Sequence, residues 1–306
     1  MKEYPSPPLD MTVRDGQYIL NKKIGTGSFG QVYLGFERGT GREIAIKLEH
    51  KESTRNMIGH EYIIYMKCLR RGNGFPRILW YGLGGDYRVL VMELMGPNLS
   101  NLLKQCGGTF HLRTVIRIAI QTLDRIQYLH DKSFIHRDLK PDNFVIGRHQ
   151  KKKGIYLLDF GLSVRYKRED GYHVRPSKES RFIGTIRYAS VNSHLGYRLS
   201  RRDDLESWFY IIMYFLHGRL PWMGYRNKNK ERYHKKICQL KKNITAKELV
   251  GTDAPSQFIR IFEHIKSLQF NQRPNYNYMR HLLDTIMTHY EISIYEPYDW
   301  ESEYSL

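Results

Sequence analysis

The stretch from Phe134 to Val145, FIHRDLKPDNFV, constrains this chain more than any other. Hydrophobic residues flank a run of polar side chains, which are His136, Arg137, Asp138, Lys140, Asp142 and Asn143, with Pro141 among them. A buried strand or helix would be apolar at such positions. The stretch therefore predicts a loop whose polar groups serve chemistry rather than the core.

The length and composition indicate a folded protein with two lobes. A chain of 306 residues with 41% hydrophobic residues can bury a sizeable core. The longest apolar run, Trp208–Leu216, is far shorter than the ~20 residues of a membrane-spanning helix. The start of the chain has no apolar stretch suited to a secretory signal, and the three cysteines are scattered. We therefore expect a reducing compartment, cytoplasm or nucleus.

The chain is strongly basic. It has 49 Lys and Arg against 31 Asp and Glu, a formal net charge of +18. Such a charge attracts nucleic acid, anionic membranes and acidic or phosphorylated proteins, and it does not choose among them. The basic residues cluster at 148–153 and 226–242. Each cluster is as compatible with a solvated face of a loop or helix as with a surface that binds anions.

Two kinds of secondary structure follow one another along the chain. Short β-rich runs between Tyr18 and Met92, several separated by glycine-containing turns, predict an antiparallel sheet. One helix, at about 56–69, interrupts them, because apolar residues recur there at spacings of three and four. Longer helical patterns follow at 114–130, 203–216, 231–241, 255–268 and 275–289.

These patterns predict an α+β fold with two lobes. The first, at 18–93, is a small antiparallel β-rich lobe with one helix, and the second, at 94–290, is larger and mainly α-helical. The boundary is expected near Met92–Pro97, because Gly96 and Pro97 end the last strand. Residues 1–17 and 291–306 are short extensions.

Three glycines, Gly25, Gly27 and Gly30, form a G-x-G-x-x-G pattern between two strand-like runs. A dinucleotide-binding fold would need a helix directly after Gly30, whereas Gln31–Phe36 continues as a strand. The glycines therefore predict a hairpin whose backbone N–H groups approach phosphate oxygens. A plain glycine-rich hairpin is the alternative.

Lys47 ends the apolar run IAIK, where an unpaired cation would be costly. Glu61, on the polar side of the interrupting helix, is its natural partner. An edge lysine that reaches solvent is the alternative reading.

Asp138 and Asn143 stand five residues apart, in the H-R-D-x-x-x-x-N arrangement of kinase catalytic loops. In that arrangement Asp138 accepts the proton of a substrate hydroxyl, Lys140 steadies the γ-phosphate, and Asn143 binds Mg²⁺. Asp159, in LLDFGL, follows an apolar strand, and its carboxylate suits the same hard cation.

The two residues before Asp138 are expected to make structural contacts in this loop. His136 is expected to make a backbone hydrogen bond rather than to act as a ligand or base. Arg137 is expected beside an anion or the activation segment. We expect the side chains of Asp138, Asn143 and Asp159 to converge on one metal ion and a triphosphate.

Together these motifs resemble the eukaryotic protein kinase family over residues 18 to about 290. The resemblance implies a kinase-like fold and ATP with Mg²⁺ as cofactors, with Lys47 oriented by Glu61 toward the α- and β-phosphates. It implies a hinge at Met92, Glu93 and Leu94, with Met92 guarding the rear of the nucleotide pocket. The residues that it places around the adenine are Ile24, Val32, Ala45 and Leu158.

The sequence is similar in particular to the casein kinase I family of Ser/Thr kinases. ASVN at 189–192 stands where A-P-E is common, and ELMGPNL, HRDLKPDNF and LPWMG accompany it. The resemblance implies that other contacts replace the partnership of the A-P-E glutamate. It also implies that Asp204 is a buried aspartate that braces the catalytic-loop backbone.

Casein kinase I enzymes favour Ser or Thr a few residues after a phosphorylated or acidic residue. The resemblance therefore implies an anion pocket, in which Arg187 and Gly224 occupy matching positions. A further lysine of that pocket falls at Tyr233 here, a departure that weakens the prediction of strong priming. The residues that could compensate are Arg226, Arg232 and Lys235.

Two other functions remain open at this point. One is a pseudokinase, a binding module that keeps the fold without turnover, although Lys47, Glu61, Asp138, Asn143 and Asp159 are all present. The other is nucleic-acid binding, for which no zinc-finger or RNP-type motif is present, so we expect no specific nucleic acid. The ending ESEYSL has no cysteine for a lipid, so we expect neither a stable membrane anchor nor autoinhibition by a long tail. We expect a monomer.

Overall fold

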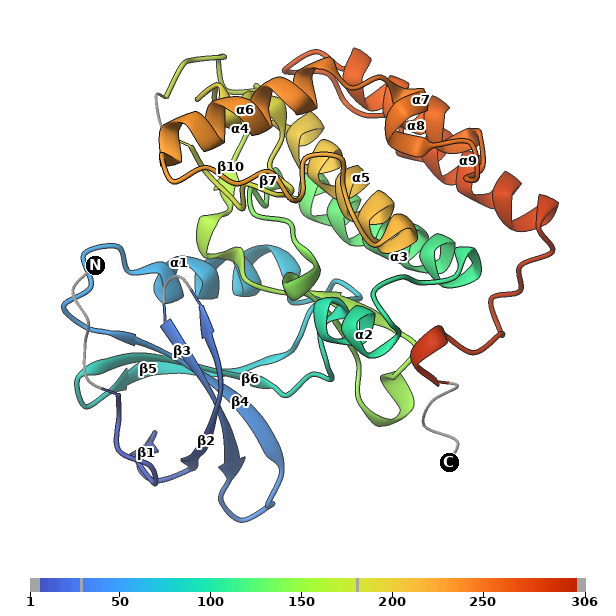
Figure 1. Ribbon diagram of the computed structural model, residues 1–306. Coiled ribbons are helices and arrows are strands. Elements are labelled where there is room, and N and C mark those ends of the chain that lie inside the picture. The colour runs from blue at the N-terminus through green and yellow to red at the C-terminus, as the bar shows by residue number, and fades with distance from the viewer. Residues whose placement is uncertain (1–5, 28–29, 180–181, 302–306) are drawn as a thin grey trace. The chain divides into compact units, whose positions relative to one another are not determined.

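The β-rich runs between Tyr18 and Met92 form one antiparallel sheet, as predicted (Figure 1). A two-residue strand that the sequence pattern does not predict extends this sheet at one edge. The strand order is β1-β2-β3-β4-β6-β5. The strands are β1 (Thr12–Val13), β2 (Tyr18–Gly27), β3 (Gly30–Glu37), β4 (Glu43–His50), β5 (Ile78–Gly84) and β6 (Tyr87–Glu93).

The computed structural model describes residues 6–27, 30–179 and 182–301. Contacts between residues divide the chain into two units. The first unit contains the chain up to Gly96 together with Val145–Gly161. The second contains Pro97–Phe144 and the chain from Leu162 onward.

The stretch Val145–Gly161 joins the first unit although it lies inside the range predicted for the larger lobe. Ile146 O accepts a hydrogen bond from Gly96 N at 2.9 Å, and Leu157 N donates to Gly74 O at 2.9 Å. These backbone bonds tie the stretch to the end of the sheet region. Its strands are β8 (Phe144–Ile146) and β9 (Ile155–Leu157), which pair with each other, and a 3₁₀ turn, His149–Lys151, lies between them.

The predicted helix at 56–69 consists of two parts. An α-helix, α1 (Met57–Ile64), continues into a π-helical turn at Tyr65–Leu69. Asn56 caps the start of α1, because its side-chain oxygen accepts a hydrogen bond from Gly59 N at 3.1 Å. The helix packs against β4, β5 and β6.

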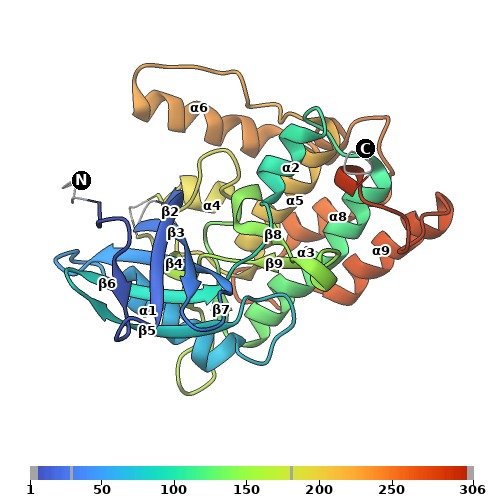
Figure 2. The same ribbon diagram turned by 90° about the horizontal axis from the view of Figure 1, so that it is seen from below.

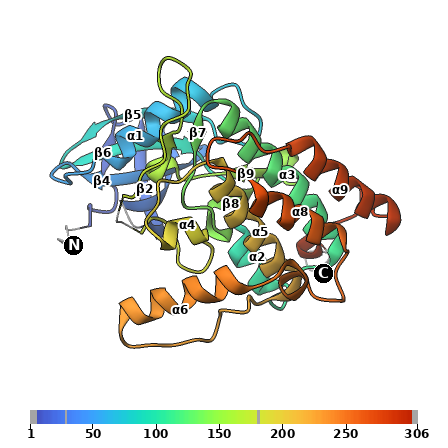
Figure 3. The same cartoon turned by 90° about the horizontal axis from the view of Figure 1, so that it is seen from above.

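The second unit is mainly helical, as predicted (Figures 1 and 2). Helix α5 is buried along most of its length and lies between α3 and α8, and α9 packs on both α3 and α8. Helix α6 lies at the margin of this unit, next to α4 (Figure 3). The helices are α2 (Leu99–Gln105), α3 (Leu112–Asp131), α4 (Val191–His194), α5 (Arg201–His217), α6 (Lys230–Asn243), α7 (Ala246–Val250), α8 (Gln257–Ser267) and α9 (Tyr276–His289).

Five of these helices, α3, α5, α6, α8 and α9, confirm the helical patterns read from the sequence, with small differences at their ends. Helices α2, α4 and α7 are not predicted, because four to seven residues are too few to display a helical period. The remaining regular elements of this unit are β7 (Phe134–Ile135), which pairs with β10 (Val164–Arg165), and short 3₁₀ turns.

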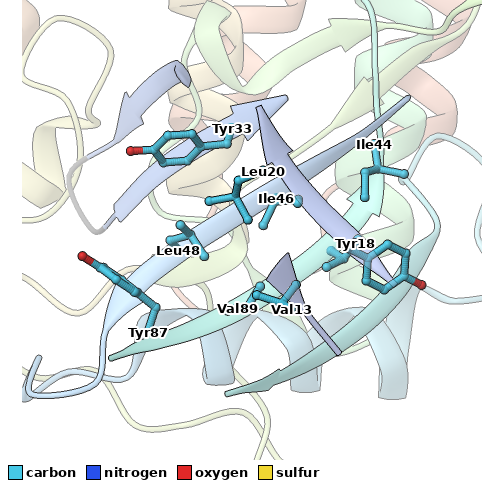
Figure 4. Close-up of a cluster of buried hydrophobic side chains, with 10 residues drawn as sticks. Val13, Tyr18, Leu20, Tyr33, Ile44, Ile46, Leu48, Tyr87 and Val89 are labelled. Carbon is cyan, nitrogen blue, oxygen red and sulfur yellow. The ribbon is translucent and has the colours of Figure 1, made fainter. Parts of the chain in front are cut away.

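One face of the sheet carries a cluster of buried hydrophobic side chains (Figure 4). Ile44, Ile46 and Leu48 alternate along β4 and are at most 1% exposed. Side chains from the neighbouring strands pack around them, which are Val13, Tyr18, Leu20, Tyr33, Tyr87, Val89 and Val91. Because successive side chains of a strand point to opposite faces, Ala45 and Lys47 lie on the other face, which α1 covers in part.

Within the described ranges of the chain, no helix is both long enough and apolar enough to cross a membrane. The observed elements confirm the α+β fold class, with an antiparallel sheet and one helix in the N-terminal region and a mainly helical C-terminal region.

We predict that Ile46→Ala lowers the free energy of unfolding by about 2–5 kcal/mol, because it removes a fully buried side chain from the sheet core. Leu83→Ala is the matched control, since Leu83 lies in the same sheet and is 70% exposed. It should change the free energy of unfolding by less than about 0.5 kcal/mol. Denaturant titration of both variants tests this, and equal losses would contradict the assigned core.

Candidate active site

Lys47 lies between two carboxylates in the first unit. Its Nζ donates to Glu61 Oε2 at 2.6 Å and to Asp159 Oδ1 at 2.8 Å. The side chains of Lys47 and Glu61 are 12% and 2% exposed, and that of Asp159 is 26% exposed. The predicted pair of Lys47 with Glu61 is therefore confirmed, and Asp159 adds a second anion that the sequence does not connect to it.

In this cluster, the positive charge of Lys47 and the negative charges of Glu61 and Asp159 stabilise one another. Burial acts to lower the pKa of Lys47, but the charges of Asp159 and Glu61 raise it well above its ordinary range. Burial raises the pKa of Glu61, against the effect of Lys47. Lys47 therefore stays charged, and each partner depends on its charge.

Glu49 fixes the helix that carries Glu61. This residue stands two positions after Lys47 on β4 and is 3% exposed. Its Oε1 accepts from Met57 N and its Oε2 from Ile58 N, each at 3.2 Å. These are the first N–H groups of α1, which have no partner within the helix. Strand β4 therefore holds α1 at its N-terminus as well as through Glu61.

Asp159 is positioned by an unusual backbone conformation after β9. Its φ is +65°, in the left-handed region, which non-glycine residues seldom adopt. The next residue, Phe160, is fully buried, and its ring lies 5.0 Å from that of Tyr65 and 5.9 Å from that of Phe75. The buried ring anchors the turn and directs the Asp159 carboxylate toward Lys47.

The glycine-rich stretch forms a hairpin between two strands, as predicted. Gly25 pairs with Val32, and Gly27 pairs with Gly30, while β3 continues after Gly30 as a strand. A Cβ on Gly30 would lie 2.3 Å from Leu48 O, so the neighbouring strand excludes any side chain there. The tip of the hairpin, residues 28 and 29, lies outside the described residues.

The residues predicted around the adenine share one face of the sheet with Lys47 in most cases. Val32 pairs with Lys47, and Ala45 pairs with Met92, so these four side chains point to the same side. Ala45 and Met92 are each 8% exposed, and Ile24 is 50% exposed. Leu158 directly precedes Asp159.

The residues predicted to form the hinge lie at the end of this sheet. Glu93 is the last residue of β6, and its carboxylate accepts from Lys151 Nζ at 2.7 Å. Glu93 and Leu94 also line a cavity of about 730 Å³ with a basic wall that includes Arg77 and Arg148. Lys47 does not line this cavity, so it is distinct from the sheet face described above.

Asp204 fixes the backbone of the HRD loop in the second unit. Its Oδ2 accepts from His136 N at 2.6 Å and its Oδ1 from Arg137 N at 2.9 Å, and His130 Nε2 lies 2.9 Å from Oδ2. Although burial acts to raise the pKa of Asp204, the hydrogen bond and charge of His130 hold it below its usual range. The predicted bracing role of Asp204 is therefore confirmed.

The same loop accounts for the two neighbours of Asp138. His136 Nδ1 accepts from Asp138 N at 3.3 Å, which confirms its predicted backbone hydrogen bond. Arg137 has a φ of +70° and donates from Nε to Leu162 O at 2.6 Å. Arg137 therefore lies beside the segment that follows D-F-G, one of the two neighbours expected for it.

Asp138 is held on both carboxylate oxygens. Thr185 Oγ1 donates to Oδ1 at 2.7 Å, and Lys140 Nζ donates to Oδ2 at 3.0 Å. Asn143 Nδ2 donates to Asp138 O at 2.9 Å and so closes the loop. Asp138 is 8% exposed. Thr185 is a site residue that the sequence analysis missed, because nothing local to residue 185 points to a contact 47 residues away.

The residues predicted to bind Mg²⁺ offer suitable donor atoms. The amide nitrogen of Asn143 is used by Asp138 O, which leaves its oxygen as the possible ligand, and Asp159 supplies a carboxylate. The described part of the chain has no cluster of three His, Cys, Asp or Glu that would form a complete protein site. Mg²⁺ bound with nucleotide needs only one or two such ligands, because water and phosphate oxygens complete its shell. The convergence of Asn143 and Asp159 on one ion stays a prediction.

The segment from Gly184 to Ser193 is held by contacts other than an A-P-E glutamate, as the resemblance implies. Ser190 Oγ and Asn192 Nδ2 donate to Asp203 Oδ1 at 2.8 and 2.9 Å. Val191 N donates to Glu206 Oε1 at 3.0 Å. Both acceptors belong to the first turns of α5, so a buried helix anchors the end of the segment.

Arg187 is exposed, and its backbone is fixed from the loop that contains Gly224. Trp222 Nε1 donates to Arg187 O at 2.8 Å, and Gly224 has a φ of +94° with open space around it. The guanidinium carbon lies 5.8 Å from the ring centre of Tyr188 and 5.7 Å from that of Tyr214.

Tyr233, at the position where a lysine is expected, also belongs to this surface. Its ring stacks on that of Tyr225, with centres 6.1 Å apart. Although partial burial acts to lower the pKa of Arg187, neighbouring tyrosine hydroxyls, including that of Tyr233, raise it. The residues suggested as compensating cations, Arg226, Arg232 and Lys235, are exposed, and Lys235 lies 3.5 Å from Glu231.

The family model of the protein kinase domain matches residues 18–287. This range covers most of the 306 residues, and the chain therefore belongs to the protein kinase domain family. The family accounts for the sheet with one helix followed by the mainly helical region, and it implies ATP as the phosphoryl donor.

We predict that Lys47→Met lowers the free energy of unfolding by about 3–5 kcal/mol near neutral pH, because it leaves the buried Glu61 without its cation. The loss should be smaller at pH 5 than at pH 8. Without Lys47, the pKa of Glu61 in the folded state rises further above its unfolded value, so stability falls as pH rises through that window. Denaturant titrations at the two pH values measure the difference.

The control for this prediction is Lys51→Met, which removes an exposed ion pair with Asp86. Its effect should not change between pH 5 and pH 8. An equal loss for Lys47→Met at both pH values would show that Glu61 does not depend on the lysine charge.

Proposed function

We propose that this chain transfers the γ-phosphoryl group of ATP to Ser and Thr hydroxyls of proteins, with a preference for acidic or phosphorylated residues upstream. The observation that carries the proposal is the setting of Asp138, a carboxylate held between the Lys140 ammonium and the Thr185 hydroxyl. A fixed carboxylate of this kind can accept a hydroxyl proton and orient the oxygen for attack. The resemblance of the loop to that of Ser/Thr kinases supports the choice of Ser and Thr.

The charged residues divide the work of phosphoryl transfer. Lys47, oriented by Glu61, binds the α- and β-phosphates, and Lys140 stabilises the charge that develops on the γ-phosphoryl group. Asp138 takes the proton from the substrate hydroxyl. Asn143 and Asp159 would hold Mg²⁺, which would supply further positive charge at the phosphates. Ile24, Val32, Ala45 and Leu158 surround the adenine in this proposal, and Met92 guards the rear of the pocket.

The proposed preference for an upstream anion rests on Arg187. Its backbone is anchored through Trp222 while its guanidinium is exposed, and an anchored Arg can bind a phosphate through two hydrogen bonds. Tyr233 brings a hydroxyl in place of a second cation, so the preference for phosphate over carboxylate should be modest.

A pseudokinase remains the main alternative. It would keep the same contacts and bind ATP without transfer to protein. Incubation with labelled ATP, Mg²⁺ and casein separates the two functions, because labelled casein is expected from an active kinase alone.

We predict that Asp138→Asn lowers kcat for a Ser peptide by about 100-fold or more, because the carboxylate that accepts the proton is lost. The variant should unfold at the same temperature as the wild type, since the amide oxygen of Asn can still accept from Thr185. Steady-state kinetics with a thermal melt test both parts. Turnover at the wild-type rate would refute the assigned role of Asp138.

We further predict that Arg187→Ala lowers kcat/KM by about tenfold or more for a peptide with phosphoserine upstream of the target serine. The same peptide with neutral upstream residues should be phosphorylated as by the wild type. Tyr233→Lys should shift the preference the other way, because it adds a cation beside Arg187. Lys228→Ala serves as the control, because Lys228 is an exposed residue of the loop before α6. An Arg187→Ala enzyme that kept its preference for the phosphopeptide would contradict the pocket.

A further inference from the structure

Lys241 is a buried lysine in a helix whose other lysines face solvent. It lies near the end of α6 and is 1% exposed, whereas Lys235, Lys236 and Lys242 of the same helix are exposed. A lysine ammonium is almost never buried without partners, because it loses its hydration. The contacts of Lys241 therefore indicate what offsets this cost.

The ammonium group of Lys241 binds the backbone on both sides of Arg187. Nζ donates to Ile186 O at 2.7 Å and to Ala189 O at 2.6 Å. Its third neighbour is His194 Nε2 at 3.3 Å. These three contacts use the three donors that a lysine ammonium has.

No carboxylate lies within ion-pair distance of Lys241 in the described part of the chain. The surroundings are aromatic instead, with the ring centres of Trp222 and Tyr210 at 5.0 and 5.2 Å from Nζ. Aromatic faces attract a cation and leave its N–H groups available for the two carbonyls. The charge of Glu206 acts on Lys241 from a longer distance and raises its pKa against burial. The direct partners of the ammonium group are backbone carbonyls, so its contacts hold a backbone segment.

The segment that Lys241 holds connects two parts of the proposed site. Thr185, one residue before Ile186, donates to Asp138. Arg187 follows Ile186, and its carbonyl is held by Trp222. The carbonyls of residues 186, 187 and 189 are therefore fixed by side chains from α6 and from the loop before it.

Lys241 can hold the two backbone carbonyls whether its side chain is charged or neutral. Burial lowers the pKa of Lys241 to about 7. A neutral amine still has two donors, one for each backbone carbonyl. Burial and the nearby Lys241 charge lower the pKa of His194 to about 3, so its ring is neutral and can accept or donate as required.

We propose that Lys241 is a positioning residue for protein substrates: it fixes residues 186–189 so that the target hydroxyl at Asp138 and the upstream anion at Arg187 are presented at a set separation. The proposal rests on the proposed function and adds a residue that touches neither ATP nor substrate. It acts through the backbone, so its loss should affect substrate binding and leave the nucleotide site intact.

The test is Lys241→Met, which keeps the length and apolar stem of the side chain and removes its donors. We expect the KM for a Ser peptide with an upstream phosphoserine to rise about tenfold or more. The KM for ATP and the slow hydrolysis of ATP without peptide should stay within about twofold of the wild type. Lys242→Met, the exposed neighbour on α6, is the matched control and should leave all three values unchanged.

These readouts separate a positioning role from a role in stability alone. A lysine that only stabilised the fold would lower the active fraction, and kcat for peptide and ATP hydrolysis would then fall together at an unchanged peptide KM. That result, or a wild-type peptide KM, would overturn the proposal. If Lys241→Met fails to fold, Lys241→Gln, which keeps one polar group in the site, is judged by the same criteria.

Failure of the proposed function would look different. If the wild-type chain bound ATP without phosphorylating any peptide, the kinase proposal itself would be wrong. If the wild type is active and Asp138→Asn is not, a normal peptide KM in Lys241→Met overturns the role of Lys241 alone.

Discussion

The carboxylate of Asp204 is the contact on which the catalytic loop depends. It lies in the first turn of α5, a buried helix, and accepts the backbone N–H groups of His136 and Arg137. This pairing holds Arg137 at a positive φ that the loop would otherwise seldom adopt. Asp138 follows directly, so its position is determined by a helix more than sixty residues later in the chain. A polar loop can therefore be as rigid as the core to which it is bonded.

The same design recurs in the other parts of the site. Lys47 is held by two carboxylates, the segment 190–193 by Asp203 and Glu206, and the segment 186–189 by Lys241. In each case a buried charged group binds several neutral or opposite partners that would be costly to leave unpaired. Arg187 differs from these groups, because its side chain is exposed and its backbone carbonyl is held by Trp222.

The features of the site that the sequence predicts are those whose interacting residues lie close together along the chain. Asp138 and Asn143 were identifiable because one short loop sets their spacing, and the strands and long helices because their periodic patterns are local. The pair of Lys47 with Glu61 follows from the cost of an unpaired cation in an apolar strand, and the resemblance to kinases adds its role toward the phosphates. Thr185, Glu49 and Lys241 gave no local signal, since their partners lie on other elements. The short helices α2, α4 and α7 were missed because so few residues carry no period.

The attachment of α1 has a mechanical consequence. Lys47 and Glu49 point to the same face of β4, and they hold α1 at Glu61 and at its first two N–H groups. With a single attachment the helix could pivot about that point. Two attachments about one helical turn apart prevent α1 from rotating about either attachment point. Helix and strand should therefore move as one body, and any loosening of this unit has to begin elsewhere than at their junction.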